Sequence, residues 1–206
     1  TSWSMLLNTD VILQELIDRM YIDHASNPDA EALVQELFAD LKDAFAERIS
    51  SADWMTDSTK QYALQKLDAM TITVGGPDAI DFSSIVLPSA SGGNALDNYV
   101  ALKGYYSDRK TSQIGEQIDS PYWPMKSYTT NAIHVTSMNR VYVSWAFLQD
   151  GYYYNSDASD ESVLGRLGMV IGHEITHGFD THGSQYGIDG TRENWWTEED
   201  RAAFQE

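Results

Sequence analysis

One short segment constrains this chain more than any other. Residues 170–180 read Val-Ile-Gly-His-Glu-Ile-Thr-His-Gly-Phe-Asp. His173 and His177 are four residues apart, so on a helix they share a face and can point both imidazoles at one ion. Zinc suits this arrangement because it takes imidazole nitrogens at about 2.0–2.1 Å. Glu174 would lie beside the metal, where it can take a proton from bound water and return it to a leaving amine.

The same spacing could also belong to a solvated helix face that holds no metal. The residues before the motif argue against this alternative, because a small and apolar run is typical of a buried helix. That run contains Leu164, Leu167, Gly168, Met169, Val170 and Ile171. A buried helix seldom carries two His and a Glu without a use for them, so the sequence favours a metal site.

Composition limits the kinds of partner and the ligands that the metal can have. The 206 residues include 31 acidic and 13 basic side chains, a formal charge of −18 that argues against nucleic acid or an anionic membrane as a partner. No apolar run approaches the ~20 residues of a membrane-spanning helix. The chain has no Cys, so zinc would need His and carboxylate ligands.

Helical spacing of apolar residues and helix-start residues predict a chain that is mostly helical. The predicted helices cover residues 11–20, 28–49, 57–70, 94 to about 118, roughly 161–179, and a last one that opens at 197–200. Residues 71–74 alternate like a short strand, and residues 131–135 and 140–145 read as a hairpin around a turn at 137–139. The fold class predicted from these elements is α+β.

The hairpin just before the metal helix has two possible roles. Its outer edge could bind an extended peptide through main-chain hydrogen bonds. Alternatively, both of its edges pair within the domain. The sequence leaves these alternatives open.

A catalytic zinc needs a third protein ligand and an open position for water. Gly183 stands where one class of zinc peptidase has a third His, and His182 lies one residue short of that position. Glu193, Glu198 and Glu199 are possible ligands, but none lies in a second motif, and the last two are typical of a helix start. We therefore expect the third ligand to lie beyond Glu206.

Several stretches of the sequence resemble the neprilysin family of zinc endopeptidases. The most specific is residues 168–180, followed by Asp189-Gly190 and Trp195-Trp196-Thr197. Upstream similarities are Trp54-Met55, Thr59-Lys60, Lys66-Leu67, Val74-Gly75, Pro77-Asp78 and Asn131-Ala132. The resemblance covers essentially the whole chain, and the absence of Cys is similar to a bacterial member. The resemblance is compatible with a cytoplasmic or a secreted protein, and a cytoplasmic location is preferred.

The resemblance implies a fold, a domain division and a reaction. The fold would be a zincin-like (thermolysin-like) catalytic lobe preceded by long helices. Residues 1–70 would belong to the family's helical domain, and residues 71–206 would form the N-terminal part of the catalytic domain. The reaction would be zinc-dependent hydrolysis of internal peptide bonds in oligopeptides. A downstream remainder of the protein would supply the third zinc ligand, either on the same chain or on a separate one.

The resemblance also implies roles for individual residues. His173 and His177 match the zinc ligands, and Glu174 matches the catalytic base. Asn131 and Ala132 match residues that bind the substrate backbone. The positions that line the family's apolar substrate pocket are Phe147, Tyr152, Met169 and Val170. Asp180 could orient a ligand imidazole from outside the metal's own ligands, or it could only end the helix.

Some positions depart from the family's pattern. Residues 143–145 read Val-Ser-Trp, residues 150–152 read Asp-Gly-Tyr, and Ile133-His134 replace the second half of the substrate-binding strand motif. These departures affect the expected shape of the pocket more than the reaction. The alternative function is a non-catalytic module that binds zinc or peptide, which applies if the chain truly ends at Glu206.

Overall fold

The computed structural model describes residues 14, 16–77, 85–112, 114–115 and 123–205. Contacts divide the chain into two compact units, residues 1–24 with 76–127, and residues 25–75 with 128–206. We call these unit 1 and unit 2 and describe each by itself. The predicted functional division at residue 70 concerns a catalytic domain rather than these units, and it stays a prediction.

Unit 2 begins with two helices that the sequence predicts closely. Helix α2 covers Pro28–Ser51, and Asn27 caps it by accepting a hydrogen bond from the Ala30 backbone N–H at 3.1 Å. Helix α3 covers Asp57–Ala69 and follows Thr56. The buried residues of these helices include Ala30, Val34 and Phe38 on α2 and Ala63 and Leu67 on α3.

A three-stranded mixed sheet lies beside these helices. Its strands are β1 (Thr71–Gly75), β2 (Ala132–Val135) and β3 (Arg140–Ser144), in the order β1-β3-β2. Strand β1 is parallel to β3, and β2 is antiparallel to β3, so the predicted strand and hairpin are confirmed. A short 3-10 turn, η2 (Thr136–Met138), joins β2 to β3 through Asn139, whose φ of 47° is left-handed.

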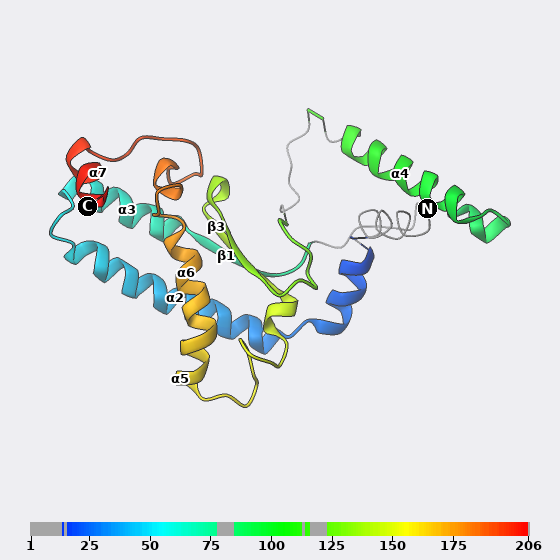
Figure 1. Cartoon of the computed structure of the whole chain (residues 1–206), viewed down its shortest axis with the longest axis horizontal. Helices are drawn as coiled ribbons and strands as arrows, with labels where there is room; N and C mark the ends of the chain where they lie inside the picture. The colour runs from blue at the N-terminus through cyan, green and yellow to red at the C-terminus, as the bar shows by residue number, and fades with distance from the viewer. Residues whose placement is uncertain (1–13, 15, 78–84, 113, 116–122, 206) are drawn as a thin grey trace. The chain divides into compact units, whose positions relative to one another are not determined.

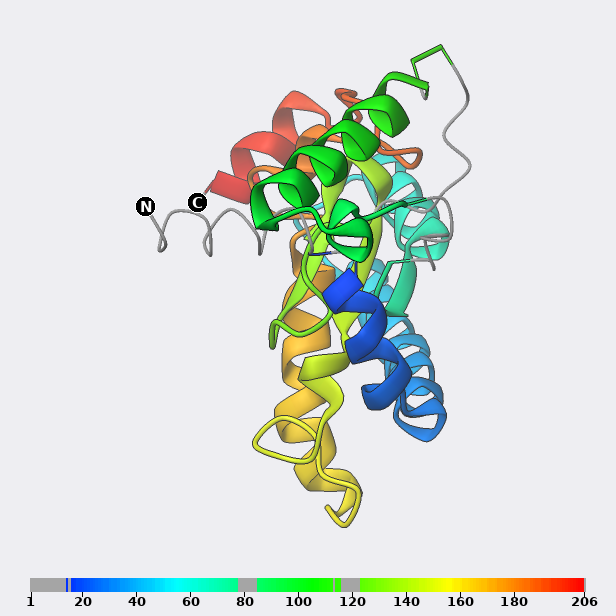
Figure 2. The same cartoon turned by 90° about the vertical axis from the view of Figure 1, so that its right-hand side faces the viewer.

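The predicted metal helix forms a continuous helical rod over residues 160–176. It consists of α5 (Asp160–Val163), a π turn η4 (Leu164–Gly168) and α6 (Met169–Thr176). Figures 1 and 2 show this rod in gold and orange, crossing α2 next to the strands. Val163, Leu167, Ile171 and Ile175 form its buried face. Residues 177–179 continue as tight turns, so the helix ends three residues before the predicted boundary at 179.

The rest of unit 2 consists of short elements. They are η3 (Trp145–Leu148), η5 (Gly183–Gln185) and α7 (Glu198–Gln205). Thr197 and Asp200 exchange hydrogen bonds at the start of α7, which confirms the predicted helix start.

The described part of unit 1 contains helical residues 16–24, the 3-10 turn η1 (Pro88–Ser91) and α4 (Ala95–Ser112). Residues 11–13 of the predicted first helix lie outside the described residues. Helix α4 ends before the predicted boundary near 118, because Ile114 and Gly115 form a turn in which Gly115 has a φ of 87°. None of the helices over the described ranges is both long and apolar enough to cross a membrane.

Candidate metal centre

The two His of the motif lie at the C-terminal end of α6, on the face opposite its buried residues. Ile171 and Ile175 are fully buried, and this anchoring turns His173 and His177 towards the open side of the helix. Their Nε2 atoms are 3.1 Å apart, and their rings meet edge to face at 4.6 Å between centroids. The side chains of His173, Glu174 and His177 therefore place three ligand-type atoms within 4.8 Å of one another.

This geometry fits a zinc ion. Two nitrogens bound to zinc at about 2.0–2.1 Å in a tetrahedral arrangement are separated by about 3.3–3.4 Å, close to the observed distance. Two Nε2 atoms that face each other this closely are suited to a shared cation. The donor set, imidazole nitrogen with carboxylate oxygen nearby, is one that zinc accepts.

Asp180 contacts the second His of the motif. Its Oδ2 lies 2.7 Å from His177 Nδ1, and its Oδ1 accepts backbone N–H bonds from His182 at 2.8 Å and Gly183 at 2.7 Å. Burial raises the pKa of Asp180, but the hydrogen bonds from His177, Gly183 and His182 outweigh burial and hold it below its ordinary value. An ionised Asp180 accepts a hydrogen bond from Nδ1–H, and this tautomer leaves the Nε2 lone pair of His177 free for a metal.

Glu174 is buried, with 7% of its surface exposed, and its carboxylate faces the sheet. The backbone N–H of His134 on β2 donates to Glu174 Oε2 at 2.9 Å. Burial raises the pKa of Glu174, while the His134 N–H and the two motif imidazoles act in the opposite direction. The carboxylate therefore lies between the edge of the sheet and the two motif imidazoles.

Strand β2 lies at the edge of the sheet, with β3 on one side and no strand on the other among the described residues. The His134 N–H points away from β3, because it donates to Glu174. Residues two apart in a strand point their backbone groups to the same side, so Ala132 also presents its N–H and C=O to the open edge. Of the two alternatives for the hairpin, the described residues fit the one in which no further strand pairs with the outer edge.

A cavity of about 310 Å³ follows this edge. It is lined by Ala132, Ile133, His134, Thr136, Glu174, His177, Asp180 and His182. The cavity therefore brings together the sheet edge, the predicted base, one predicted ligand and Asp180. Asn131 lies at the start of the strand and is exposed, and its backbone N–H is 3.4 Å from Ser144 Oγ.

The four positions expected to line an apolar pocket lie outside this cavity. Phe147 is buried and stacks on Tyr153 at 4.4 Å between ring centroids. Tyr152 and Met169 are 71% and 60% exposed, and Arg166 lies over the Tyr152 ring. Val170 is partly exposed. Within the described part of the chain, these side chains do not enclose a pocket with the motif.

The three carboxylates considered as third ligands are not at the centre. Glu193 accepts a hydrogen bond from the Tyr62 hydroxyl, and Glu198 and Glu199 lie in the first turn of α7. Among the described residues, the metal-type cluster contains only His173, Glu174 and His177.

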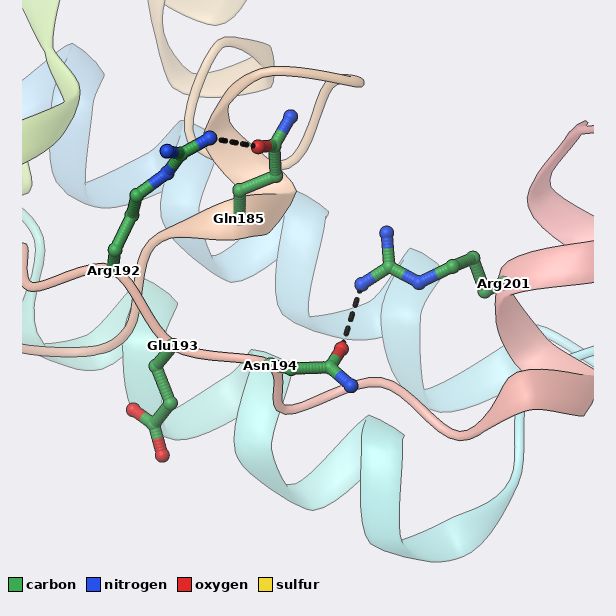
Figure 3. A pocket seen from close by; sticks show the side chains of 5 residues that line it. All are labelled: Gln185, Arg192, Glu193, Asn194 and Arg201. Carbon is green, nitrogen blue, oxygen red and sulfur yellow. Dashed lines mark hydrogen bonds between the residues drawn. The ribbon is translucent and has the colours of Figure 1, made fainter.

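A separate polar pocket of about 400 Å³ lies on the segment after the motif (Figure 3). Arg192 donates to Gln185 Oε1, and Arg201 donates to Asn194 Oδ1, both at 2.7 Å. Figure 3 shows the Glu193 carboxylate pointing away from both guanidinium groups. No motif residue lines this pocket, so it is distinct from the candidate metal centre.

The sequence analysis assigned no role to three buried polar residues around the centre. Lys66 is fully buried and donates to three backbone carbonyls. Asn139 donates from Nδ2 to the carbonyls of Lys66 and Ile188. Burial, with the charges of Lys66 and His177, lowers the pKa of His134 to about 4, so its imidazole is neutral at pH 7. The left-handed Asn139 fits a turn signal, but the burial of Lys66 has no signature in the local sequence.

Comparisons with family models and with known proteins indicate one and the same family. Residues 2–77 and residues 131–206 each match a model described as peptidase family M13, and together the two matches cover most of the chain. The neutral endopeptidase of Lactococcus lactis is 28% identical over 188 residues, which are 91% of this chain and 29% of that protein. Human neprilysin is 26% identical over an alignment of 209 positions, which includes 94% of this chain and 26% of neprilysin.

Solved structures have the same fold. The Mycobacterium tuberculosis zinc metalloprotease Zmp1, in complex with an inhibitor, is 30% identical with a TM-score of 0.80 over 95% of this chain and 29% of Zmp1. PepO from Lactobacillus rhamnosis is 26% identical with a TM-score of 0.83, over 95% of this chain and 31% of PepO. The fold is therefore zincin-like, as the resemblance implied. The chain spans under a third of the length of these relatives.

Proposed function

Because the chain belongs to peptidase family M13, we propose that it carries the catalytic half-site of a zinc-dependent endopeptidase that hydrolyses internal bonds of oligopeptides. The observation that carries this proposal is the pair of Nε2 atoms 3.1 Å apart on His173 and His177, with buried Glu174 between them and the sheet edge. When bound, zinc supplies Lewis-acid chemistry that acidifies water and polarises a carbonyl.

The residues of this chain divide the remaining tasks. His173 and His177 hold the ion, and Asp180 fixes the imidazole of His177. Glu174 accepts a proton from the attacking water and passes it to the leaving amine. Ala132, with Asn131 before it, binds the peptide backbone along the open edge of β2, which keeps the substrate extended.

Two further parts of the proposal depend on the family. Phe147, Tyr152, Met169 and Val170 line an apolar substrate pocket that is completed by residues outside the described part of the chain. The third zinc ligand also comes from a downstream part of the protein, and this agrees with the share of its relatives that the chain spans.

The test replaces Glu174 by Gln in the protein that contains this chain. Glu174→Gln keeps the volume but removes the base, so we expect one zinc per site as in the wild type, and turnover of a fluorogenic oligopeptide lower by about 10²–10⁴-fold. Glu198→Gln, at the exposed start of α7, is the matched control and should keep full activity. Activity near the wild-type value in Glu174→Gln would refute the role of Glu174.

The second candidate is a module that binds zinc or peptide without catalysis. It is favoured by the exposure of His173 and by the two-His site of the described residues. Mass spectrometry of the purified protein under native conditions, with metal analysis, separates the candidates. Zinc retained by this chain alone, without turnover, would support the binding module.

A further inference from the structure

Lys66 is the most unusual charged residue of unit 2. Its side chain on α3 is fully buried, and its Nζ donates to the carbonyl oxygens of Gly178 at 2.7 Å, Gly183 at 2.8 Å and Tyr186 at 2.7 Å. These bonds use all three N–H groups of an ammonium. The ion pairs found among the described residues do not include Lys66. A buried cation is costly, so its retention here calls for an explanation.

All three acceptors belong to one segment, residues 178–186, which follows the metal motif directly. Without Lys66 the Gly178 carbonyl would lose its donor, while the Gly183 and Tyr186 carbonyls would each keep one, from the Tyr186 N–H and the Trp195 Nε1–H, both at 3.0 Å. The segment folds back on the end of the helix so closely that a Cβ on Gly183 would lie 1.9 Å from the His177 carbonyl oxygen. The rings of Phe179 and Trp195 lie 5.6 and 5.7 Å from Lys66 Nζ and flank the cation.

The same segment carries Asp180. Its Oδ1 is held by the N–H groups of His182 and Gly183, and its Oδ2 contacts His177 Nδ1. Gly183 thus donates its N–H to Asp180 and accepts a hydrogen bond from Lys66 at its C=O. The path from Lys66 to the imidazole runs through one backbone residue and one carboxylate.

We propose that Lys66 is a positioning residue of the metal site: it fixes the conformation of residues 178–186 and thereby holds the Asp180 carboxylate against His177. The inference rests on the proposed function, since it concerns zinc binding by His173 and His177. A residue that only stabilises the fold would change unfolding without a specific effect on zinc, and the two roles can be separated by measurement.

The experiment is a double-mutant cycle on the zinc dissociation constant, measured with a competing chromophoric chelator in the protein that contains this chain. Loss of a group that orients a ligand imidazole typically weakens metal binding 10–100-fold. We expect Lys66→Met and Asp180→Asn each to weaken zinc binding by about this factor. Because both act through one contact, the double variant should bind zinc no more than about twofold more weakly than either single variant.

Lys42→Met is the matched control. Lys42 donates from α2 to the carbonyls of Asp68 and Met70, so it also links elements through backbone acceptors, but none of its acceptors belongs to residues 178–186. The Lys42→Met variant should have lower thermal stability and an unchanged zinc affinity. Lys66→Gln, which keeps an amide donor on a shorter side chain, is measured beside Lys66→Met.

The outcomes separate the two proposals. Additive effects of Lys66→Met and Asp180→Asn, or an unchanged zinc affinity in folded Lys66→Met, would overturn the role of Lys66 alone. Failure of both Lys66 variants to fold would also overturn it, since Lys66 would then serve the fold as a whole. Wild-type protein that binds no zinc would overturn the proposed function together with this inference.

Discussion

Asp200 shows how one carboxylate can connect distant parts of the sequence. It is fully buried and accepts hydrogen bonds from the Thr56 backbone N–H at 2.7 Å and from the hydroxyls of Thr56, Thr59 and Thr197 at 2.5–2.6 Å. It therefore holds Thr197, which caps α7, and the start of α3 at the same time. Burial raises the pKa of Asp200, but the hydrogen bonds from Thr197, Thr56 and Thr59 outweigh it and lower the pKa to about 2.

We predict that Asp200→Asn lowers the free energy of unfolding at pH 7 by about 1.5–3 kcal/mol, the range for hydrogen bonds to a charged group. The stabilisation by Asp200 is complete above its ordinary pKa of about 4 and is lost as the pH falls towards 2. The difference between variant and wild type should therefore shrink between pH 4 and pH 2.

Urea unfolding at pH 7, 4 and 2.5 measures this dependence. Asp40→Asn, on the exposed surface of α2, changes the charge equally and should have little effect. A difference that stays constant from pH 7 to pH 2.5 would show that ionised Asp200 is not the cause.

Residues differ in how well the sequence predicts their environment. The cap between Thr197 and Asp200 is local, and the spacing Thr-Glu-Glu-Asp predicts it. The bonds from Thr56 and Thr59 join residues more than 140 positions apart, which no local pattern encodes. The burial of Lys66 was equally hidden, because its acceptors are backbone carbonyls that any sequence could supply.

At the scale of elements, the edge of β2 connects fold and proposed chemistry. In the register of the hairpin Ile133 faces Tyr142 and Ala132 faces Val143. Since His134 points its N–H outward, Ala132 does so too, and Ile133 points its N–H towards β3. Neighbouring residues of one strand thus face different ways, one towards the open edge and one towards the sheet.

Proline substitutions at these neighbours should have opposite consequences. Ala132→Pro removes an outward N–H and should leave the hairpin formed, while the KM for an oligopeptide rises about 2–10-fold through loss of one hydrogen bond. Ile133→Pro removes a ladder hydrogen bond and should lower the free energy of unfolding by about 1–3 kcal/mol. Steady-state kinetics and thermal unfolding of both variants test this, and a reversed pattern would refute the assigned direction of the edge.

The elements themselves were largely predictable from the sequence. Helical spacing and caps predicted α2, α3 and α7, and alternation predicted β1 and the hairpin. The parallel pairing of β1 with β3 was not predictable, because the strands are separated by more than 60 residues. The end of α4 was predicted too late, since apolar residues continue past Ser112 while Gly115 turns the chain.

At the scale of the molecule, the two ends of the long segment 76–127 lie next to each other. A Cβ on Gly76 would lie 3.0 Å from the Cβ of Ser127, so the ends of this long segment are adjacent. Unit 2 has its own sheet, its own buried helix faces and the stacked pairs Trp54–Trp196 and Tyr62–Trp195. These features give it the contents of an independent domain.

We predict that residues 25–75 joined to residues 128–206 by a short Gly-Ser linker fold without residues 76–127. Near-UV circular dichroism should keep the signal of the stacked aromatic pairs, and urea unfolding should remain a single cooperative transition. The intact chain measured under the same conditions is the reference. A broad transition with no near-UV signal would contradict the independence of unit 2.

The π turn at Leu164–Gly168 has a consequence for how the metal helix tolerates change. The buried residues Val163, Leu167, Ile171 and Ile175 recur every four positions, and in a regular α-helix each such step would rotate the face by about 40° beyond a full turn. A π turn closes through longer i→i+5 bonds and reduces the rotation per residue. It therefore sets the angular phase between the residues before the motif and the imidazoles after it. With the same residues in a regular α-helix, the two ends would be rotated further relative to each other, so the π turn keeps the buried face before the motif and the imidazoles after it in their present phase.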